Sequence, residues 1–282
     1  MKARPSVRIA VSSLRHPLLR RFREAWRRGE LTEDGCCAVE GQHLLEEAFR
    51  SPVEVVALLA SQSAEAQLAR FEAANPSAGS GQVGRIRSYV TSDRIFRALA
   101  PTETPQGLAA LVRLATPPLE EALSRPSHGA GLAVALIGLQ DPGNLGTILR
   151  SLEAFGGAAC LLGPDSVSPY NPKAVRASAG SLFRVPVYRG VASDKILDLA
   201  RRHGLQAVAL APRASLALNQ LDLTKPTVFF IGREGSGLPD DLLKQADRVA
   251  RIPLAAGVES LNAAMAASLA LYEAARQRGF KE

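Results

Sequence analysis

The chain has 282 residues, of which 46% are hydrophobic and 22% are charged, and its formal net charge at pH 7 is +7. This composition is typical of a folded globular protein, so it argues against a disordered or fibrous chain, and the length has room for two domains. The longest apolar run, residues 132–139, is too short to cross a bilayer, and the three cysteines suit neither a disulfide framework nor a metal site.

Positive charge is concentrated at the start of the chain. Residues 1–28 hold nine lysines and arginines against one acid, Glu24, so their net charge is +8 and the other 254 residues are close to neutral, at −1. A phosphate-rich partner favours such a segment, although a solvated helix face that keeps the protein soluble gives the same pattern. Arginines interrupt every apolar stretch here, which argues against a secretory signal, whereas a transit peptide stays open. We expect a cytoplasmic protein without a metal site or a membrane partner.

The first predicted helix has one apolar face and one face rich in arginine. Ser12 or Ser13 would cap this helix. Its apolar positions follow the helical period and are Leu14, Leu18, Leu19, Phe22 and Trp26. The opposite face is the candidate surface for RNA. Further along, a short apolar segment at 36–39 is followed by a predicted helix at 41–50, a strand at 53–59, a helix at 64–74, and strands near 86–90 and 108–113. This alternation favours a parallel or mixed sheet with helical crossovers.

Prolines and glycines cluster between residues 116 and 131, which predicts a linker between a domain at 1–115 and a domain at 132–282. Strands in the second half are predicted at 132–139, 158–162, 183–187, 206–211, 227–232 and 249–254. Helices are predicted at 144–155, 172–179, 193–203, 239–246 and 260–278. This is the pattern of a doubly wound α/β unit, whose ligands bind beyond the carboxyl ends of its parallel strands.

Polar residues follow the first of these strands. Glycines allow a tight turn there, and Asn144 is placed to cap the next helix. The apolar positions of that helix form one stripe that Arg150 avoids, so Arg150 is available to a phosphate or a reacting group. A surface arginine near a helix start gives the same pattern without any function.

Three glycines within six residues, Gly232, Gly235 and Gly237, directly follow the strand at 227–232. Such a loop can wrap its backbone around a flat or charged small molecule. It is neither a dinucleotide fingerprint nor a Walker A loop. Glu234 is either a functional carboxylate or a charge near the start of the following helix.

The third loop leads from Arg251 into the last helix. Pro253 ends the strand, Gly257 frees the loop, and Ser260 is placed to cap the helix. Stability alone does not explain the polar Asn262 in the first turn, nor an alanine-rich face that would pack within the monomer or across a dimer.

Taken in this order, DPGNLGTILRSLEAFG (141–156), FIGREGSGLP (230–239) and RIPLAAGVESLNAAMAASLALYE (251–273) resemble three motifs of the SpoU family of RNA ribose 2′-O-methyltransferases, of the SPOUT class. In the first half, VSSLRHPLLRRF, AVEGQHLLEEA and PTETPQGLAALV are similar to the family's substrate-binding domain. The resemblance implies an α/β fold: a parallel-sheet SPOUT domain with a deep C-terminal trefoil knot, and a smaller N-terminal α/β domain similar to a ribosomal-protein-type RNA-binding fold.

The resemblance also implies the cofactor, S-adenosylmethionine, which leaves as S-adenosylhomocysteine. By position, the residues implied to hold it are Leu210, Gly232, Ile252, Leu254 and Leu261. The residues implied to surround the transferring methyl group and the target ribose are Asn144, Arg150, Glu234, Ser260 and Asn262. A homodimer with the last helix at its interface is implied as well.

The role of Arg150 stays open between two alternatives. A guanidinium, with a pKa above about 12, is a poor base in isolation, so Arg150 either handles the hydroxyl proton directly or holds the adjacent RNA phosphate. This sequence also departs from the family's usual residues at Leu210, Arg233, Leu254 and Ala264. These departures bear on substrate detail rather than on activity.

Three other functions compete with ribose methylation of ribosomal RNA. The enzyme would instead methylate a base nitrogen, or a ribose of transfer RNA, or the chain would bind RNA without catalysis. A generic nucleotide-binding protein is disfavoured because both phosphate motifs are missing. The additional N-terminal domain with its basic segment favours the larger ribosomal RNA over transfer RNA.

Overall fold

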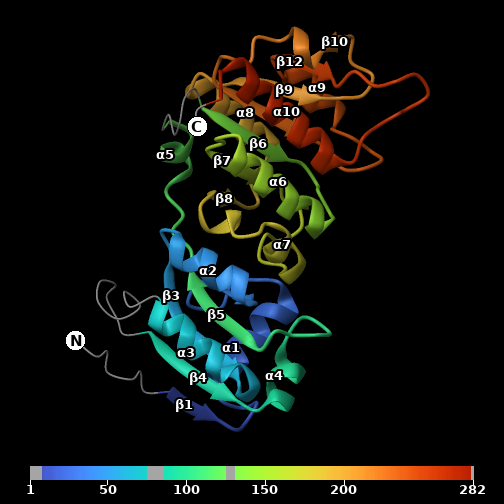
Figure 1. Ribbon diagram of the computed structural model, residues 1–282. Coiled ribbons are helices and arrows are strands. Elements are labelled where there is room, and N and C mark those ends of the chain that lie inside the picture. The colour runs from blue at the N-terminus through green and yellow to red at the C-terminus, as the bar shows by residue number, and fades with distance from the viewer. Residues whose placement is uncertain (1–7, 75–85, 125–130, 281–282) are drawn as a thin grey trace. The chain divides into compact units, whose positions relative to one another are not determined.

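The computed structural model describes residues 8–74, 86–124 and 131–280. It divides into two compact units, the first comprising Met1–Ala115 with Tyr170–Phe183, and the second Thr116–Pro169 with Arg184–Glu282 (Figure 1). Two of the cations counted in the basic segment, Lys2 and Arg4, lie outside the described residues, as does the middle of the predicted linker, 125–130. None of the described helices has the length and apolar character needed to cross a membrane.

The first unit is a mixed α/β unit. Its elements are β1 (Arg8–Val11), α1 (Pro17–Arg28), β2 (Cys36–Glu40), α2 (Gln42–Arg50), β3 (Glu54–Ser61), η1 (Gln62–Ala64), α3 (Glu65–Ala74), β4 (Arg87–Thr91), α4 (Asp93–Leu99), β5 (Leu108–Arg113), α7 (Pro172–Ala177) and η3 (Ser181–Phe183). The strands form one sheet in the order β1-β4-β3-β5-β2. β4 pairs in parallel with β1 and β3, whereas β5 is antiparallel to β3 and β2.

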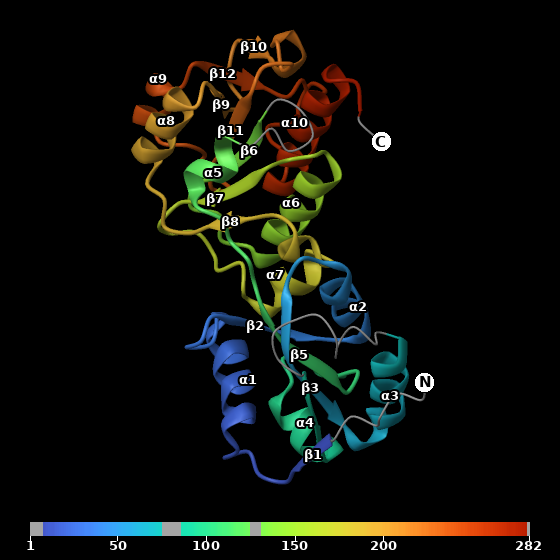
Figure 2. The same ribbon diagram turned by 90° about the vertical axis from the view of Figure 1, so that its left-hand side faces the viewer.

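Helices cover both faces of this sheet because alternate strand residues point to opposite sides. α1 and α4 bury Phe22, Trp26 and Phe96 against one face, together with Leu59 and Leu111 of the strands. Figure 2 shows α1 on one side of the sheet and α2 and α3 on the other. The first unit therefore has a hydrophobic core of its own.

Two predictions about the start of the chain are corrected. The first helix begins at Pro17 rather than after Ser12 or Ser13, and its cap is His16, whose Nδ1 accepts from the Leu18 N–H at 3.3 Å. Proline is well suited to the first helical turn because its missing N–H has no partner there in any case. Leu14 precedes the helix and still packs against the core. The short strand β1 and helix α4 were not predicted.

The second unit is built on one parallel sheet. Its elements are α5 (Leu119–Ser124), β6 (Leu132–Leu136), α6 (Pro142–Ala154), β7 (Ala159–Leu162), β8 (Val187–Tyr188), α8 (Ser193–Arg202), β9 (Gln206–Leu210), β10 (Leu216–Ala217), η4 (Leu218–Gln220), β11 (Thr227–Ile231), α9 (Asp240–Gln245), β12 (Arg248–Arg251) and α10 (Ala263–Gln277). The strand order is β10-β12-β9-β11-β6-β7-β8, and every pairing is parallel. This confirms the α/β fold class that the alternation indicates.

The seven strands lie between two layers of helices (Figure 2). α5, α8 and α9 pack on one face, where Ala122, Leu197 and Phe230 belong to one buried cluster. α6 and α10 lie on the other face. Strands buried on both faces are nearly continuous hydrophobic runs, and β6 and β11 are buried throughout.

Two segments of the second half differ from the prediction. The strand expected at 183–187 is a 3-10 turn, Ser181–Phe183, followed by the two-residue strand β8. Pro186 explains the difference, because proline has no N–H for the ladder and offers only its carbonyl, which accepts from Cys160 N at 3.0 Å. The predicted linker contains the helix α5, whose Ala122 and Leu123 are buried in the second unit's core.

Candidate functional site

The three loops with unusual composition follow β6, β11 and β12, which lie within four consecutive strands of the sheet. β11 pairs with both β6 and β9, and β9 pairs with β12. Because all four strands are parallel, their carboxyl ends meet at one edge of the sheet. The backbone continues this pairing into the loops, where Ile137 N–H donates to the Ile231 carbonyl at 2.9 Å. The loops after β6 and β11 therefore start side by side, and the loop after β12 starts at the same edge with β9 between it and β11.

The first loop leads into α6, and here the prediction of its cap is wrong. Asp141 is the N-cap, and its Oδ1 accepts from the Asn144 backbone N–H at 2.8 Å. Pro142 occupies the first helical turn, so the helix starts earlier than the predicted residue 144. The Asn144 side chain is consequently not used for capping and is available to contact other loops.

The second loop folds back on itself. Arg233 and Gly237 exchange two backbone hydrogen bonds, of 3.2 and 2.9 Å. A Cβ on Gly232 would lie 2.2 Å from the Gly237 carbonyl carbon, closer than any side chain tolerates. Gly235 and Gly237 both have positive φ angles, +89° and +71°. The glycines thus permit a turn that presents Glu234 near its tip.

The third loop ends on a residue with two roles. Asn262, rather than the predicted Ser260, is the N-cap of α10, and its Oδ1 accepts from Ala264 N–H at 2.9 Å and Met265 N–H at 3.3 Å. The helix therefore begins at Ala263, and Ser260 lies in the exposed loop before it. The side-chain nitrogen of Asn262 takes no part in capping and points to other partners.

Three of the five predicted catalytic residues meet through one carboxylate oxygen. Glu234 Oε1 accepts from Asn144 Nδ2 at 2.7 Å, from Asn262 Nδ2 at 3.1 Å and from Ala263 N at 3.3 Å. Asn262 Nδ2 also lies 3.1 Å from Asn144 Oδ1. These contacts join all three loops at one point, and we call Asn144, Glu234 and Asn262 the polar cluster.

The other two predicted catalytic residues stand outside this cluster. Arg150 lies further along α6 with its side chain exposed, as its position off the buried stripe predicts. Within the part of the chain that the structure describes, neither Arg150 nor Ser260 has a side-chain hydrogen bond or an ion pair. A guanidinium with no protein partner is free to bind an anion.

Three of the five residues predicted to hold the cofactor lie at the same edge, and Leu254 and Leu261 lie in the loop between β12 and α10. Leu210 ends β9, Gly232 follows β11, and Ile252 follows β12. Leu210, Ile252 and Leu261 are partly exposed, and Leu254 is 37% exposed. The adenine ring and the methylene groups of S-adenosylmethionine would pack on accessible apolar side chains, and its polar groups would bind the glycine-rich backbone. These residues therefore fit S-adenosylmethionine.

One contact at this edge was not anticipated. Arg233 donates through Nε to the Gly138 carbonyl at 3.2 Å and so ties the second loop to the first. Gly138 has φ +74°, and its missing side chain leaves room for the guanidinium, since a Cβ there would lie 3.1 Å from Arg233 Nε. In the sequence, Arg233 stands out only because it departs from the family's usual residue at that position. That departure does not indicate that Arg233 would contact Gly138.

The alanine-rich face of α10 is used inside the subunit. Ala267, Ala270 and Ala274 are fully buried, and Ser268 Oγ lies 2.6 Å from Ser151 Oγ of α6. Of the two alternatives for that face, packing within the monomer and packing across a dimer, the structure shows the first, because the small residues let α10 approach α6 closely. The residues that α10 exposes instead are larger, and Met265 and Tyr272 are 53% and 45% exposed.

In the first unit, α1 separates apolar and basic residues as predicted. The apolar residues buried by the helix are Leu18, Leu19, Phe22, Ala25 and Trp26. Arginines that are exposed, with no ion pair to any described residue, are Arg15, Arg23, Arg27 and Arg28. Arg8, in contrast, is paired with Glu72 at 2.8 Å and Glu65 at 3.1 Å. Only part of the basic segment is therefore available to a polyanion.

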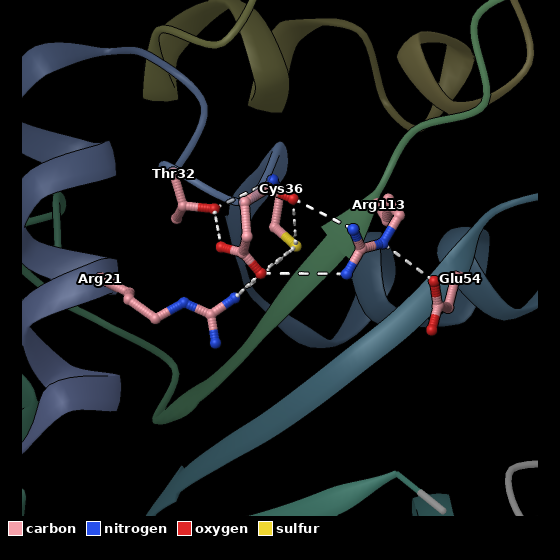
Figure 3. A network of polar contacts seen from close by, with 6 residues as sticks. Arg21, Thr32, Cys36, Glu54 and Arg113 are labelled. Atoms are coloured by element: carbon pink, nitrogen blue, oxygen red, sulfur yellow. Dashed lines mark hydrogen bonds and ion pairs between the residues drawn. The ribbon is translucent and has the colours of Figure 1, made fainter. Parts of the chain in front are cut away.

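Arg21 is a second cation of the basic segment that is engaged in an ion pair within the first unit (Figure 3). Its Nη2 lies 2.5 Å from Asp34 Oδ2, and Arg113 donates to the Asp34 carbonyl and to Glu54 Oε2, at 3.1 and 2.9 Å. The Cys36 thiol lies 3.5 Å from the same Asp34 carboxylate, and burial together with that charge raises its pKa. This network fastens α1 to the sheet and leaves Cys36 as an unreactive thiol.

Two family models match the chain. The model described as the SpoU rRNA Methylase family matches residues 131–272, and the model described as the MRM3-like substrate binding domain matches residues 19–110. The first match contains all three loops, and the second runs from within α1 to the start of β5.

Similar proteins align over nearly the whole chain. An uncharacterized tRNA/rRNA methyltransferase of Synechocystis is 33% identical, with 95% of this chain and 94% of the relative covered. The 23S rRNA (guanosine(2553)-2′-O)-methyltransferase RlmP of Bacillus subtilis is 29% identical, with 93% and 97% covered. Among solved structures, the SpoU methyltransferase AviRb from Streptomyces viridochromogenes in complex with the cofactor AdoMet has a TM-score of 0.79 and 28% identity, with 94% of this chain and 98% of that chain covered. The AdoMet-bound rRNA methyltransferase from Sinorhizobium meliloti has a TM-score of 0.78 and 27% identity, with 95% and 97% covered.

Proposed function

Because the chain belongs to the SpoU rRNA methylase family, we propose that it transfers a methyl group from S-adenosylmethionine to a ribose 2′-hydroxyl of ribosomal RNA. The observation that carries this proposal is the polar cluster. One carboxylate oxygen of Glu234 joins Asn144 and Asn262 from two other loops, at the sheet edge where the apolar cofactor residues also lie. That arrangement puts hydrogen-bonding groups next to a surface suited to an adenosyl group.

S-adenosylmethionine supplies a methyl group that is electrophilic because it is attached to a positively charged sulfur. The protein must align the ribose oxygen with this methyl group and provide a path for the hydroxyl proton. Glu234 fixes the two asparagines, and Asn144 Nδ2 keeps a second hydrogen that can orient the ribose. We assign Arg150 to the RNA phosphate next to the target ribose, because a guanidinium is charged throughout the working pH range and binds phosphate strongly. The proton then passes to that phosphate or to water.

Ribosomal RNA is favoured over transfer RNA by two observations. RlmP, which is named as a 23S rRNA methyltransferase, aligns with 93% of this chain. The first unit also adds four exposed arginines, Arg15, Arg23, Arg27 and Arg28, and such a surface extends the contact with a large folded RNA. Transfer RNA remains the competing substrate.

We further propose that the enzyme is a cytoplasmic homodimer in which α10 contributes to the interface. Met265, Leu269 and Tyr272 are between 38% and 53% exposed on this helix, and clustered apolar side chains of this size favour protein contacts. The trefoil knot and the domain boundaries 1–115, 116–131 and 132–282 also stay predictions.

The proposed function is tested by incubating the purified protein with S-adenosylmethionine and unmodified 23S rRNA or bulk tRNA. Digestion and nucleoside mass spectrometry should reveal a 2′-O-methylated nucleoside in the ribosomal RNA only. A methyl group on a base would replace the proposal by base methylation, and modification of tRNA alone would refute the ribosomal assignment. No product, together with no binding of S-adenosylmethionine at millimolar concentration, would favour the non-catalytic alternative.

Arg150→Ala tests the role assigned to the guanidinium. We expect methyl transfer to fall by more than about 100-fold, because losing a charged contact to the substrate at the reacting centre costs several kcal/mol. The affinity for S-adenosylmethionine, measured by calorimetry, should stay within about threefold of wild type. Arg202→Ala is a matched control, since Arg202 is an exposed arginine of α8 on the opposite face of the sheet. Loss of cofactor binding in Arg150→Ala would contradict the assignment.

A further inference from the structure

The first unit contains a hollow of about 530 Å³ that the function described above does not use. Its lining consists of Gln42, His43 and Glu46 of α2, Gln67 of α3, and Gln106 of the turn before β5. The volume lies within the usual range for small-ligand sites, about 300–1,000 Å³. All five side chains carry groups that can donate or accept hydrogen bonds, and neither lysine nor arginine is among them.

A buried carboxylate holds one wall of the hollow in place. Glu40 is only 8% exposed, and its two oxygens accept from the Gln106 backbone N–H at 3.0 Å and from the Thr102 hydroxyl at 2.8 Å. Gln106 Oε1 in turn accepts from the Gln42 backbone N–H at 3.0 Å. The turn at 102–106 and the start of α2 are thus fixed to each other without a ligand.

Two glycines make this close approach possible. Gly41 has φ +103°, and a Cβ there would lie 3.1 Å from Gln106 Oε1. Gly107 has φ +79°, and a Cβ there would lie 2.5 Å from Ser61 Oγ. A side chain at Gly41 would push against Gln106, and one at Gly107 would push the turn away from Ser61 at the end of β3, so either would deform the hollow.

The hydrogen bonds already made determine which groups are left for a ligand. With Oε1 of Gln106 engaged, its Nε2 is a donor that has no partner among the described residues. Gln42 Nε2 donates to Glu46 Oε1 at 2.8 Å, so Gln42 Oε1 and Glu46 Oε2 remain as acceptors. Gln67 is exposed, and its side-chain amide offers a carbonyl oxygen as acceptor and an NH2 group as donor. The hollow therefore presents both donors and acceptors within a small space.

This chemistry selects among the parts of an RNA chain. A phosphate is disfavoured because Glu46 is negatively charged and no cation lines the hollow. An apolar ligand would take water away from the donors and acceptors that these side chains leave unused, without replacing its hydrogen bonds. A nucleobase carries donors and acceptors along its edge, and glutamine side chains pair with such edges in a bidentate manner. The edge is accessible only when the base is not paired with another base.

We propose that this hollow binds one unpaired nucleobase of the RNA substrate through its hydrogen-bonding edge. The proposal rests on the proposed function in one respect, that RNA is the substrate. It gives the first unit a contact that depends on the base, in addition to the contact of the α1 arginines with the backbone. The first unit then helps to choose the site of methylation.

The test compares two probes on the full-length protein by fluorescence anisotropy. One is a 12-nucleotide single-stranded RNA of mixed sequence, and the other is a 12-unit abasic ribose-phosphate strand with the same charge. Gln106→Glu keeps the Oε1 acceptor for Gln42 but removes the Nε2 donor, and Gln67→Leu removes an exposed amide from a helix. Gln62 is exposed and does not line the hollow, so Gln62→Glu and Gln62→Leu are matched controls for charge and for size.

We expect Gln106→Glu and Gln67→Leu to weaken binding of the mixed-sequence RNA by about 5- to 20-fold relative to their controls, the size of a lost base contact. Binding of the abasic strand should differ by less than about twofold between each variant and its control. The proposal is overturned if wild type binds the abasic strand as tightly as the RNA, if it binds neither at 1 mM, or if the variants match their controls. Methyl transfer by wild type is measured separately, so that failure of the enzyme assay and failure of the base contact remain distinguishable.

Discussion

Removal of the Glu234 carboxylate is the most direct perturbation of the polar cluster. In Glu234→Ala, Asn144 Nδ2, Asn262 Nδ2 and Ala263 N lose their common acceptor, which they reach at 2.7, 3.1 and 3.3 Å. Because the cluster is exposed to water, each hydrogen bond contributes toward the lower end of the usual range, about 0.5–1 kcal/mol. The three together hold the loops with about 1.5–3 kcal/mol.

This energy predicts the effect on catalysis. If the loops must be ordered for methyl transfer, kcat/KM falls by about 10- to 150-fold in Glu234→Ala. Glu234→Gln retains an oxygen acceptor but loses the charge, and charge-assisted hydrogen bonds are about twice as strong as neutral ones. We therefore expect this variant to lose only about 3- to 10-fold. The free energy of unfolding should fall by no more than the about 1.5–3 kcal/mol that the three hydrogen bonds contribute, because the loosened segments are surface loops and the sheet below them stays intact.

The assay measures transfer of a tritiated methyl group to ribosomal RNA at varied RNA concentration, alongside urea unfolding of each variant. Ser236→Ala is the control, since Ser236 is an exposed residue of the same loop. The reasoning is refuted if Glu234→Ala retains kcat/KM within threefold of Ser236→Ala. It is also refuted if the free energy of unfolding falls by clearly more than about 3 kcal/mol, because the loss of activity would then reflect unfolding of more than the loops.

Three further predictions concern backbone space, thiols and acid stability. In Gly232→Ala, the added Cβ meets the Gly237 carbonyl carbon at 2.2 Å, so the turn must open and the Kd for S-adenosylmethionine measured by calorimetry should rise at least about tenfold; an unchanged Kd would contradict this. Burial raises the pKa of Cys37 and of Cys160 to about 12, so neither thiol should react with a disulfide reagent at pH 8 until the protein is unfolded in guanidinium, and rapid labelling of the native protein would exclude this burial. A side-chain hydrogen bond from the arginine three residues further along holds the pKa of Glu273 below its ordinary 4.5, so Glu273→Gln should lower stability by up to about 1 kcal/mol above pH 4.5. Wild type and this variant should converge as the pH falls through the lowered pKa, and a difference that grows toward acid pH in urea unfolding would show that the sign is wrong.

The sequence predicts the second unit better than the first because its strands are buried on both faces. Continuous apolar runs such as those of β6 and β11 mark a parallel sheet with little ambiguity, and the glycine-rich loops then fall at its carboxyl edge. Nothing in the residues fixes the order of the strands, however. That β11 lies between β6 and β9 is a tertiary result, and it is this order that brings Glu234 to Asn144.

The errors of prediction have local causes. The starts of α6 and α10 each offer two capping residues within a few positions, and the choice of Asp141 over Asn144, and of Asn262 over Ser260, depends on where the chain enters the helix. β1 is a four-residue edge strand whose pattern is too short to recognise. Side-chain partners across the fold, such as Arg233 with the Gly138 carbonyl, leave no trace in spacing.

Asn262 both caps α10, the longest helix of the described structure, and donates a hydrogen bond to Glu234. These two roles limit which residue types can occupy position 262. Most helix starts accept serine, threonine, aspartate or asparagine with little difference, because all four offer an oxygen to the free amides. Here the same side chain must also give a hydrogen to a carboxylate, so aspartate would set two negative groups about 3 Å apart and serine would be too short to do both. The Asn262 side chain therefore couples the order of the reactive loops to the start of α10. A substitution that loosens the loops should also fray the first turn of α10, and one that frays this turn should also loosen the loops.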